Sequence, residues 1–408
     1  MNAIGARDEK RAAAPEGAAA PSGAAASRGA AIPCAPAAAP GREAGLGLAR
    51  SVMARYPRAD VSWHYEHGLF LGAARAAARA WDDPGLDAAA RERIASLVGA
   101  GGEIRGYRVD EFNLDQVNPG RNLFALLDET GDRRYAAAIS TLSRQLASHP
   151  RGKSGGYWHK KVYPEQMWLD GLYMAQPFKT LAALRDGDAS ALEDVVRQFA
   201  LMESKARDPR TGLLYHAWDE SRAQLWANPE TGCSPHFWGR AIGWFAMALV
   251  DVIEYLPLAF AGRARLGEIM GRLAEAVAPY QDASTGLWYQ VVDQAGREGN
   301  YPEASVSSML SYALAKAARL GASDPGPARA SAAKAHEGAC ARFLAQDGSG
   351  GLRLEGTCSV AGLGGKPYRD GSYAYYVREP VKTDDFKGVG PFILAAIEYE
   401  NGRDSGSR

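Results

Sequence analysis

Apolar residues recur at steps of three and four along most of the chain between residues 46 and 400. The pattern is clearest in residues 68–81, 238–256, 265–280 and 303–320, where alanine, leucine, arginine and glutamate fill most other positions. This spacing places the apolar side chains on one face of a helix, and the other residues favour helix formation. The alternating pattern of a strand is scarce, so the sequence predicts an all-α protein.

One motif occurs twice. Residues 208–219 (DPRTGLLYHAWD) and 282–293 (DASTGLWYQVVD) share D-x-x-T-G-L-x-Y-x-x-x-D at an offset of 74 residues, with weaker copies at 128–135 and 347–354. Each copy follows a helical stretch, and its glycine suits a left-handed turn after a helix. Helical hairpins repeated over about 350 residues predict an (α/α)6 barrel with long loops at one end, or else an open superhelical scaffold.

The two ends of the chain differ from its middle. Residues 1–45 are rich in alanine, proline, glycine and serine, and they bury too little apolar surface to offset the entropy of ordering. We therefore expect a disordered tail there, a single barrel domain over residues 46–400, and a frayed end at 401–408. The early charged residues and the lack of an apolar stretch before the small-residue tract argue against a secretory signal.

The composition narrows the class of protein. The 408 residues are 46% hydrophobic and carry 47 basic and 47 acidic side chains, which is typical of a soluble globular protein without general attraction to nucleic acid or to a membrane. The cysteines at 34, 233, 340 and 358 lack zinc-site spacing, which indicates free thiols and favours a cytoplasmic location. The histidines show no metal-ligand spacing, so we expect neither metal nor cofactor.

Four segments are dense in tryptophan, aspartate, arginine and glycine. They span residues 113–124, 157–178, 213–244 and 356–392. Aromatic rings beside carboxylates suit a sugar ligand, whose ring faces are apolar and whose hydroxyls need polar partners. In the second segment Asp170 lies between Trp168 and a run of leucine, tyrosine and methionine. An ionised carboxylate in apolar surroundings needs compensation, so Asp170 is either a catalytic residue or a structural one that caps a helix or pairs with an arginine.

The blocks 115-DQVNPGRNLF-124, 167-MWLDGLYM-174 and 237-FWGRAIGW-244, with the segment 356–392, resemble glycoside hydrolase family 105, the unsaturated rhamnogalacturonyl hydrolases. The resemblance runs from about residue 50 to 400 and keeps several blocks in order, which is more specific than one short motif. Ile242 departs from the pattern, which has asparagine or methionine there in many relatives. The resemblance implies an (α/α)6 barrel.

The resemblance also implies a reaction. Members of the family remove a 4,5-unsaturated galacturonyl residue from the non-reducing end of rhamnogalacturonan (pectin) fragments by hydrating a vinyl ether. A general acid protonates carbon 4, positive charge develops at carbon 5, and water adds there to give a hemiketal that opens. One carboxyl group can serve as acid and then as base, so the spacing rule for two carboxylates in other glycosidases does not apply.

The resemblance assigns Asp170 as general acid and base, with a pKa that its apolar setting is expected to raise. Asp115 matches the second aspartate, which holds sugar hydroxyls and keeps Asp170 in a proton-sharing state. The substrate-binding candidates are His216, Arg240, Trp244, Trp168, His159, Lys160 and Tyr65.

Individual roles follow for these candidates. His216 orients the water or binds a hydroxyl, and Trp168 stacks on the unsaturated ring. His159 and Lys160 are expected to bind the uronate carboxylate. Lys366 and Arg369, in the glycine-rich segment, are weaker candidates for contact with the same anionic substrate.

Arg240 and Trp244 lie at positions i and i+4 and so share one helix face, where they suit a carboxylate contact and stacking.

Each assignment has a structural alternative. Asp115 can be a turn or N-cap residue, His216 a hydrogen-bonded core histidine, and Arg240 half of a salt bridge between helices.

Other functions stay open at this point. The nearest is an unsaturated glucuronyl hydrolase that acts on other uronate-bearing fragments. An epimerase or polysaccharide lyase on a similar barrel is disfavoured by the MWLDGLYM block. A non-catalytic carbohydrate-binding scaffold would keep the aromatic residues and have no need of Asp170. The expected partner is a small oligosaccharide, with the protein a monomer or homodimer.

Overall fold

The computed structural model describes residues 37–406, and the side chains of residues 37–403. They belong to the second of two units into which the chain divides, which spans Ala35–Arg408. Twelve of the helices in the described residues form six consecutive hairpins. The pairs are α1 (Arg42–Arg55) with α2 (Tyr65–Ala80), α3 (Pro84–Ala95) with α4 (Arg121–Thr130), α5 (Arg133–Ala147) with α6 (Leu169–Asp186), α7 (Ala189–Ala206) with α8 (Gly239–Tyr255), α9 (Ala261–Val277) with α10 (Ala304–Leu320), and α11 (Pro325–Phe343) with α13 (Phe386–Gly406).

The remaining elements are short and lie in the connections. The helical ones are α12 (Tyr373–Arg378), η1 (Arg58–Asp60), η2 (Val109–Glu111), η3 (Leu114–Gln116), η4 (Asn118–Gly120) and η5 (Ala278–Tyr280). The strands form three antiparallel pairs, β1 (Gln166–Trp168) with β2 (Ala217–Asp219), β3 (Leu344–Gln346) with β4 (Leu352–Leu354), and β5 (Thr357–Cys358) with β6 (Val381–Lys382).

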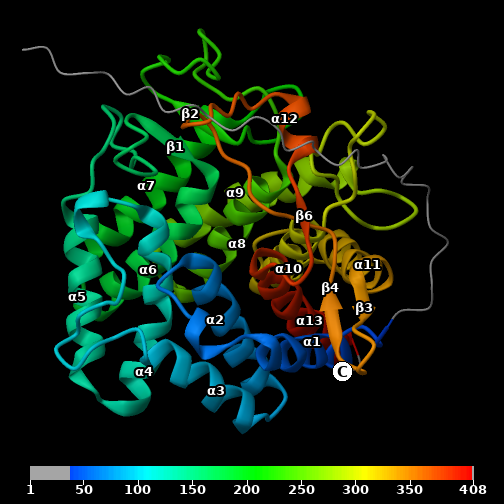
Figure 1. Ribbon diagram of the computed structural model, residues 1–408. Helices are drawn as coiled ribbons and strands as arrows, with labels where there is room; N and C mark the ends of the chain where they lie inside the picture. The colour runs from blue at the N-terminus through cyan, green and yellow to red at the C-terminus, as the bar shows by residue number, and fades with distance from the viewer. Residues whose placement is uncertain (1–36, 407–408) are drawn as a thin grey trace, which may run out of the picture. The chain divides into compact units, whose positions relative to one another are not determined.

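The second helix of each hairpin belongs to an inner ring. In this ring α2 packs against α13, α13 against α10, α10 against α8, and α8 against α6. The ring closes where α6 contacts α4 and η4, because η4 also contacts α2. The first helices of the hairpins pack around the outside, and Figure 1 shows α1 lying beside α13 where the last hairpin meets the first. The expected (α/α)6 barrel is confirmed, and an open scaffold is excluded for the described residues because the ring closes.

The layer that each helix occupies follows from its sequence. Helix α8 is apolar nearly all round, and every residue from Gly239 to Ile253 is buried, which is the pattern of a helix surrounded by others. The outer helix α3 buries only Leu86, Ala90 and Ile94, at steps of four, and its other faces carry charged residues. An apolar surface all round a helix is stable only inside the ring, whereas a narrow apolar stripe suffices outside.

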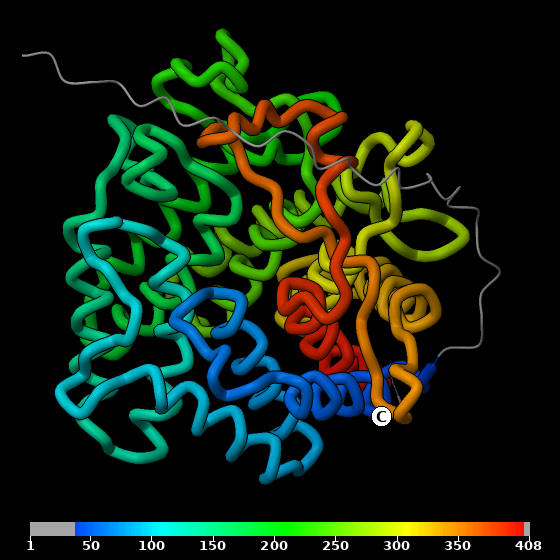
Figure 2. The backbone as a smooth tube through the Cα atoms, viewed as in Figure 1, coloured from blue at the N-terminus to red at the C-terminus, as the bar shows by residue number. Residues whose placement is uncertain are grey.

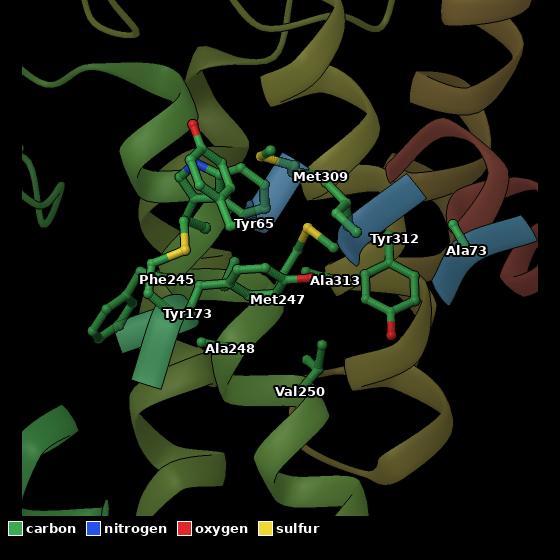
Figure 3. Packing of buried hydrophobic residues seen from close by; sticks show 14 of the residues in the cluster. Tyr65, Ala73, Tyr173, Phe245, Met247, Ala248, Val250, Met309, Tyr312 and Ala313 are labelled. Carbon is green, nitrogen blue, oxygen red and sulfur yellow. The ribbon is translucent and has the colours of Figure 1, made fainter. Parts of the chain in front are cut away.

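Side chains from the inner helices fill the middle of the ring. Tyr65 from α2, Tyr173 from α6, Met247 from α8 and Met309 from α10 point toward one another between the helices (Figure 3). Methionine adapts to irregular gaps, and the tyrosine rings bury large apolar surfaces. The barrel interior is therefore a packed core and not an open channel along its full length.

A buried charged cluster ties the C-terminal parts of α8 and α10 to the start of α4. Asp251 on α8 accepts hydrogen bonds from Arg121 (2.6 Å), Lys316 (2.8 Å) and the hydroxyl of Tyr312 (2.6 Å). Burial by itself would raise the pKa of Asp251, but Lys316 and Arg121 outweigh that effect and lower it to about 2. Arg121 belongs to the VNPGRNLF block, so this part of the block serves the barrel wall between α4, α8 and α10.

Apart from α4, whose first residue Arg121 belongs to this cluster, the inner helices begin at the opposite end of the ring. Arg240, the second residue of α8, pairs with Glu303 just before α10, and Lys387 at the start of α13 pairs with Glu66 at the start of α2. In Figure 2 the part of the connection 344–385 around α12, in orange, lies beside the connection 207–238, in green, and the amide of Trp226 donates to the Tyr368 hydroxyl. The N-termini of α2, α6, α8, α10 and α13 supply partial positive charge there, which favours an anionic ligand.

The ends of the barrel differ slightly from the expected boundaries. Helix α1 begins at Arg42, not after residue 45, and α13 continues to Gly406, past residue 400. Gly45 lies so close to α13 that a Cβ atom at this position would be 2.6 Å from Ala396 Cβ, so the chain is packed in the core before residue 46. The rest of the predicted tail, residues 1–36, lies outside the described residues.

Two findings concern other expectations from the sequence. Cys233, Cys340 and Cys358 are buried free thiols, as predicted, and Cys34 lies outside the described residues. Within residues 37–406 no helix is both long enough and apolar enough to cross a membrane.

Candidate active site

A two-stranded ladder brings Asp170 and His216 together. Strand β1 leads directly into α6, whose second residue is Asp170, and β1 pairs antiparallel with β2 so that Trp168 lies opposite Ala217. The amide of Leu169 donates to the carbonyl of His216 at 3.0 Å. As a result His216 Nε2 lies 3.4 Å from Asp170 Oδ2, although the two residues are far apart in sequence.

A second local contact positions Asp115. This residue lies in η3, where the side chain of Asn113 accepts a hydrogen bond from the Asp115 amide at 3.0 Å. The backbone of Asn113 also forms an antiparallel β-bridge with that of Lys160. In this arrangement Lys160 Nζ lies 2.5 Å from Asp115 Oδ2. His159 Nε2 lies 3.6 Å from Asp115 Oδ1. The structure therefore brings together Asp115, His159 and Lys160, three of the site candidates named from the sequence.

The two aspartates have different electrostatic surroundings. Burial favours the neutral form of Asp115, but Lys160 and His159 outweigh burial and hold the pKa of Asp115 below its ordinary value. In the same pair burial opposes the charge on Lys160, while Asp115 raises the Lys160 pKa overall. Asp115 is thus held as a carboxylate. Asp170 has no lysine or arginine within ion-pair distance in the described part of the chain, and its charged-group neighbour is His216.

His159 and Tyr65 connect the two aspartates. Burial lowers the pKa of His159 to about 4, and Asp115 and Asp170 both act against that shift, so His159 lies near both carboxyl groups and is neutral at pH 7. Burial also raises the pKa of Tyr65 well above its ordinary value, with further increases from Glu66, Asp115 and Asp170. The side chains of Asp170 and Asp115 are 13% and 11% exposed, so each keeps a small contact with solvent.

Trp168 supports the site and offers little surface to a ligand. Its indole ring is 5% exposed and stacks against His159 (centroids 4.7 Å apart) and Tyr163 (4.9 Å). It meets the His216 ring edge-on at 5.3 Å. The prediction that Trp168 stacks on the sugar is corrected, because its ring is occupied in orienting the two histidines beside the aspartates.

Arg240 and Trp244 also lie in the core. Arg240 is 1% exposed and donates to Ser305 Oγ (2.8 Å), to Glu303 (3.2 Å) and to the backbone carbonyls of residues 358 and 359. Trp244 stacks on Tyr173 with centroids 4.6 Å apart and is equally buried. The expected sugar contacts of both residues are corrected, and Arg240 forms the salt bridge between helices that was its structural alternative.

The segment 356–392 brings two residues to the site, the weaker candidate Arg369 and Tyr376, which the sequence did not single out. The hydroxyl of Tyr376 lies 2.8 Å from His216 Nδ1, and Arg369 donates to the hydroxyl of Tyr163 at 2.8 Å. Arg369 is close enough to Lys160 to oppose the rise of the Lys160 pKa. For Tyr376 the only signal in the sequence was its place in the segment 356–392. Lys366, in the same segment, is exposed.

The model of Glycosyl Hydrolase Family 88 matches residues 47–402, which is nearly all of the described chain. The chain belongs to this glycoside hydrolase family. A solved glycoside hydrolase of family 105 from C. acetobutylicum ATCC 824 is 42% identical, with a TM-score of 0.84 over 87% of this chain and 98% of that one. This likeness confirms the resemblance to family 105 stated from the sequence blocks. A glycosidase of this kind takes an oligosaccharide substrate.

Two further relatives have printed activities. The unsaturated rhamnogalacturonyl hydrolase YesR of Bacillus subtilis (strain 168) is 30% identical over 214 residues, which are 51% of this chain and 59% of YesR. The unsaturated glucuronyl hydrolase of Bacillus sp. GL1, which degrades glycosaminoglycan, is 15% identical, with a TM-score of 0.66 over 88% of this chain and 96% of that one. The second likeness shows a shared barrel fold.

The arrangement in this family 88 and 105 site suits acid–base chemistry on an anionic sugar. It combines a carboxylate held ionised by a lysine, a second carboxyl group beside a histidine, and helix N-termini that favour negative charge. In the described residues no group of three or more histidine, cysteine, aspartate or glutamate side chains is arranged to hold a metal ion.

Proposed function

We propose that the protein removes a 4,5-unsaturated galacturonyl residue from the non-reducing end of rhamnogalacturonan oligosaccharides by hydrating the vinyl ether. The observation that carries the proposal is the contrast between the two aspartates. Lys160 holds Asp115 in its charged form, whereas Asp170 has no lysine or arginine beside it in the described residues and lies 3.4 Å from His216 Nε2. One acidic group that can exchange a proton and one that stays charged are what this reaction requires.

In the proposed reaction Asp170 first acts as an acid. Its carboxyl proton goes to carbon 4 of the unsaturated ring, and the positive charge that develops at carbon 5 is shared with the ring oxygen. The Asp170 carboxylate then takes a proton from a water molecule as the water oxygen bonds to carbon 5. The resulting hemiketal opens and releases the remaining oligosaccharide, and Asp170 is protonated again for the next cycle.

The neighbouring charges support this cycle. The oxygens of Asp115 can accept hydrogen bonds from sugar hydroxyls. Lys160 uses one N–H for Asp115, and its ammonium group carries two more for the uronate carboxylate. Arg369 adds a second positive charge on the same side. Lys160, Arg369 and the helix N-termini thus form the proposed uronate-binding face.

The relatives support a rhamnogalacturonan fragment over a glycosaminoglycan fragment. The chain is 30% identical to a rhamnogalacturonyl hydrolase over about half its length and 15% identical to a glucuronyl hydrolase. The proposal includes a cytoplasmic enzyme that acts on short fragments, and the three buried free thiols of the described residues agree with a reducing compartment.

The test follows the ultraviolet absorbance of the conjugated uronate with purified protein. The substrates are an unsaturated galacturonyl-rhamnose disaccharide and an unsaturated glucuronyl disaccharide, and the variants are Asp170→Asn and the exposed control Asp110→Asn. We expect the first disaccharide to lose its absorbance faster. Asp170→Asn should lower kcat at least about 1000-fold, because it removes the proton donor, and Asp110→Asn should leave kcat unchanged.

Each other outcome has a definite meaning. Turnover of the glucuronyl disaccharide alone would support the role of Asp170 but show that the proposed substrate is wrong. Turnover that survives Asp170→Asn would refute the mechanism, and binding of either sugar without turnover would favour a carbohydrate-binding scaffold.

A further inference from the structure

Tyr376 joins the candidate active site from a distant part of the chain. It lies on the short helix α12, is fully buried, and its ring stacks on Trp238 with centroids 6.0 Å apart. Its hydroxyl lies 2.8 Å from His216 Nδ1. Burial raises the pKa of Tyr376 well above its ordinary value, so the phenol keeps its proton and can donate it in a hydrogen bond.

This contact selects one form of the His216 ring. When the Tyr376 hydroxyl donates to Nδ1, the neutral imidazole carries its hydrogen on Nε2, which lies 3.4 Å from Asp170 Oδ2. In the other tautomer a lone pair on Nε2 would face the lone pairs of the carboxylate, which is repulsive. The geometry around both ring nitrogens therefore favours an Nε2–H that faces the Asp170 oxygen.

Each copy of the internal repeat contributes one residue that contacts Tyr376. Gln290 occupies the position in the second copy that His216 occupies in the first. Gln290 Nε2 donates to the backbone carbonyl of Tyr376 at 3.0 Å, and Gln290 Oε1 accepts from Trp238 Nε1 at 3.2 Å. One copy of the repeat thus contacts the hydroxyl of Tyr376, and the other fixes its backbone independently of the hydroxyl.

We propose that Tyr376 is a positioning residue that holds His216 in the tautomer and orientation in which Nε2–H faces Asp170. This inference rests on the proposed function of Asp170. When Asp170 has given its proton to carbon 4, a hydrogen on His216 Nε2 lies beside the new carboxylate, 3.4 Å from Oδ2 in this structure, and stabilises its negative charge. Gln290 acts one step further away, because it keeps the Tyr376 backbone in place.

The kinetic test removes one hydroxyl at a time from helix α12. Tyr376→Phe keeps the ring that packs on Trp238 and loses only the contact with His216. Tyr373→Phe is the matched control, because the Tyr373 hydroxyl donates to the backbone carbonyls of residues 297 and 298, away from the histidine. With the unsaturated disaccharide that the wild type hydrolyses, we expect Tyr376→Phe to lower kcat about tenfold with KM within about twofold, and Tyr373→Phe to change neither.

A spectroscopic test needs no substrate and so separates this inference from the proposed function. Nitrogen-15 NMR of protein labelled at the histidine rings reports the tautomer of each histidine, and the signals of His216 are those missing from a His216→Asn variant. The wild type and Tyr373→Phe should show one tautomer at His216 with the hydrogen on Nε2, and Tyr376→Phe should show a mixture. An unchanged tautomer in folded Tyr376→Phe, or a kcat equal to that of Tyr373→Phe, would overturn the inference.

Discussion

The charged cluster at the far end of the barrel gives a stability prediction that can be worked from the structure. Asp251 is 3% exposed, and Asp251→Asn keeps its shape but removes the charge that compensates Lys316 and Arg121. The Asp251 pKa falls from 3.8 to about 2, and at about 1.4 kcal/mol per pKa unit this corresponds to about 2 kcal/mol of stability at pH 7. Loss of a buried partner costs about 3–5 kcal/mol in other proteins, so we expect a loss of about 2–5 kcal/mol.

The sign of the pH dependence follows from the lowered pKa. The contribution of Asp251 is fully present above its unfolded pKa of 3.8 and is lost as the pH falls toward its folded pKa of about 2. About half of the pKa-linked part should therefore be gone by pH 3, and the gap between wild type and Asp251→Asn should narrow there.

The assay is urea unfolding followed by circular dichroism at pH 7 and at pH 3, with the midpoint as the measured quantity. Asp110→Asn is the control, since Asp110 pairs with Arg108 at a site where both side chains are well exposed and should cost less than about 0.5 kcal/mol. Asp251 lies twelve residues from the start of α8, about 18 Å along its axis, so kcat of the folded variant should be unchanged. A variant that unfolds at the wild-type midpoint, or a gap that is the same at both pH values, would refute this account of the cluster.

Two more predictions concern the candidate site. Lys160→Gln should raise KM for the unsaturated disaccharide. Burial of Asp115 is then no longer offset by Lys160, so the Asp115 pKa should rise and the acidic limb of the pH–activity profile should move to higher pH. An acidic limb that does not move would show that Lys160 does not control the charge of Asp115. Arg240→Met should lower stability by about 3–5 kcal/mol in thermal or urea unfolding, because it leaves Glu303 buried without its partner. The folded fraction of that variant should keep the wild-type KM, whereas a KM raised tenfold would restore Arg240 as a substrate contact.

Local properties of the sequence were enough to predict the helices. The steps of three and four in α8 and α10 predict helices, whereas the place of both helices in the inner ring came from the structure. The paired repeat at 208–219 and 282–293 predicts hairpins, and the block MWLDGLYM directs attention to Asp170. These predictions need only the spacing and type of residues within one element or in neighbouring elements.

The roles of individual side chains depended on contacts between distant elements. Arg240 and Trp244 share a helix face, as predicted, but that face meets Glu303 on α10 and Tyr173 on α6 inside the barrel. Tyr376 lies 160 residues from His216, and helical periodicity carries no information about such a partner. By itself the sequence determined the helices, their order and the two candidate aspartates. Only the closed ring decided which charged and aromatic residues face solvent and which face one another, because burial depends on the packing of the whole barrel.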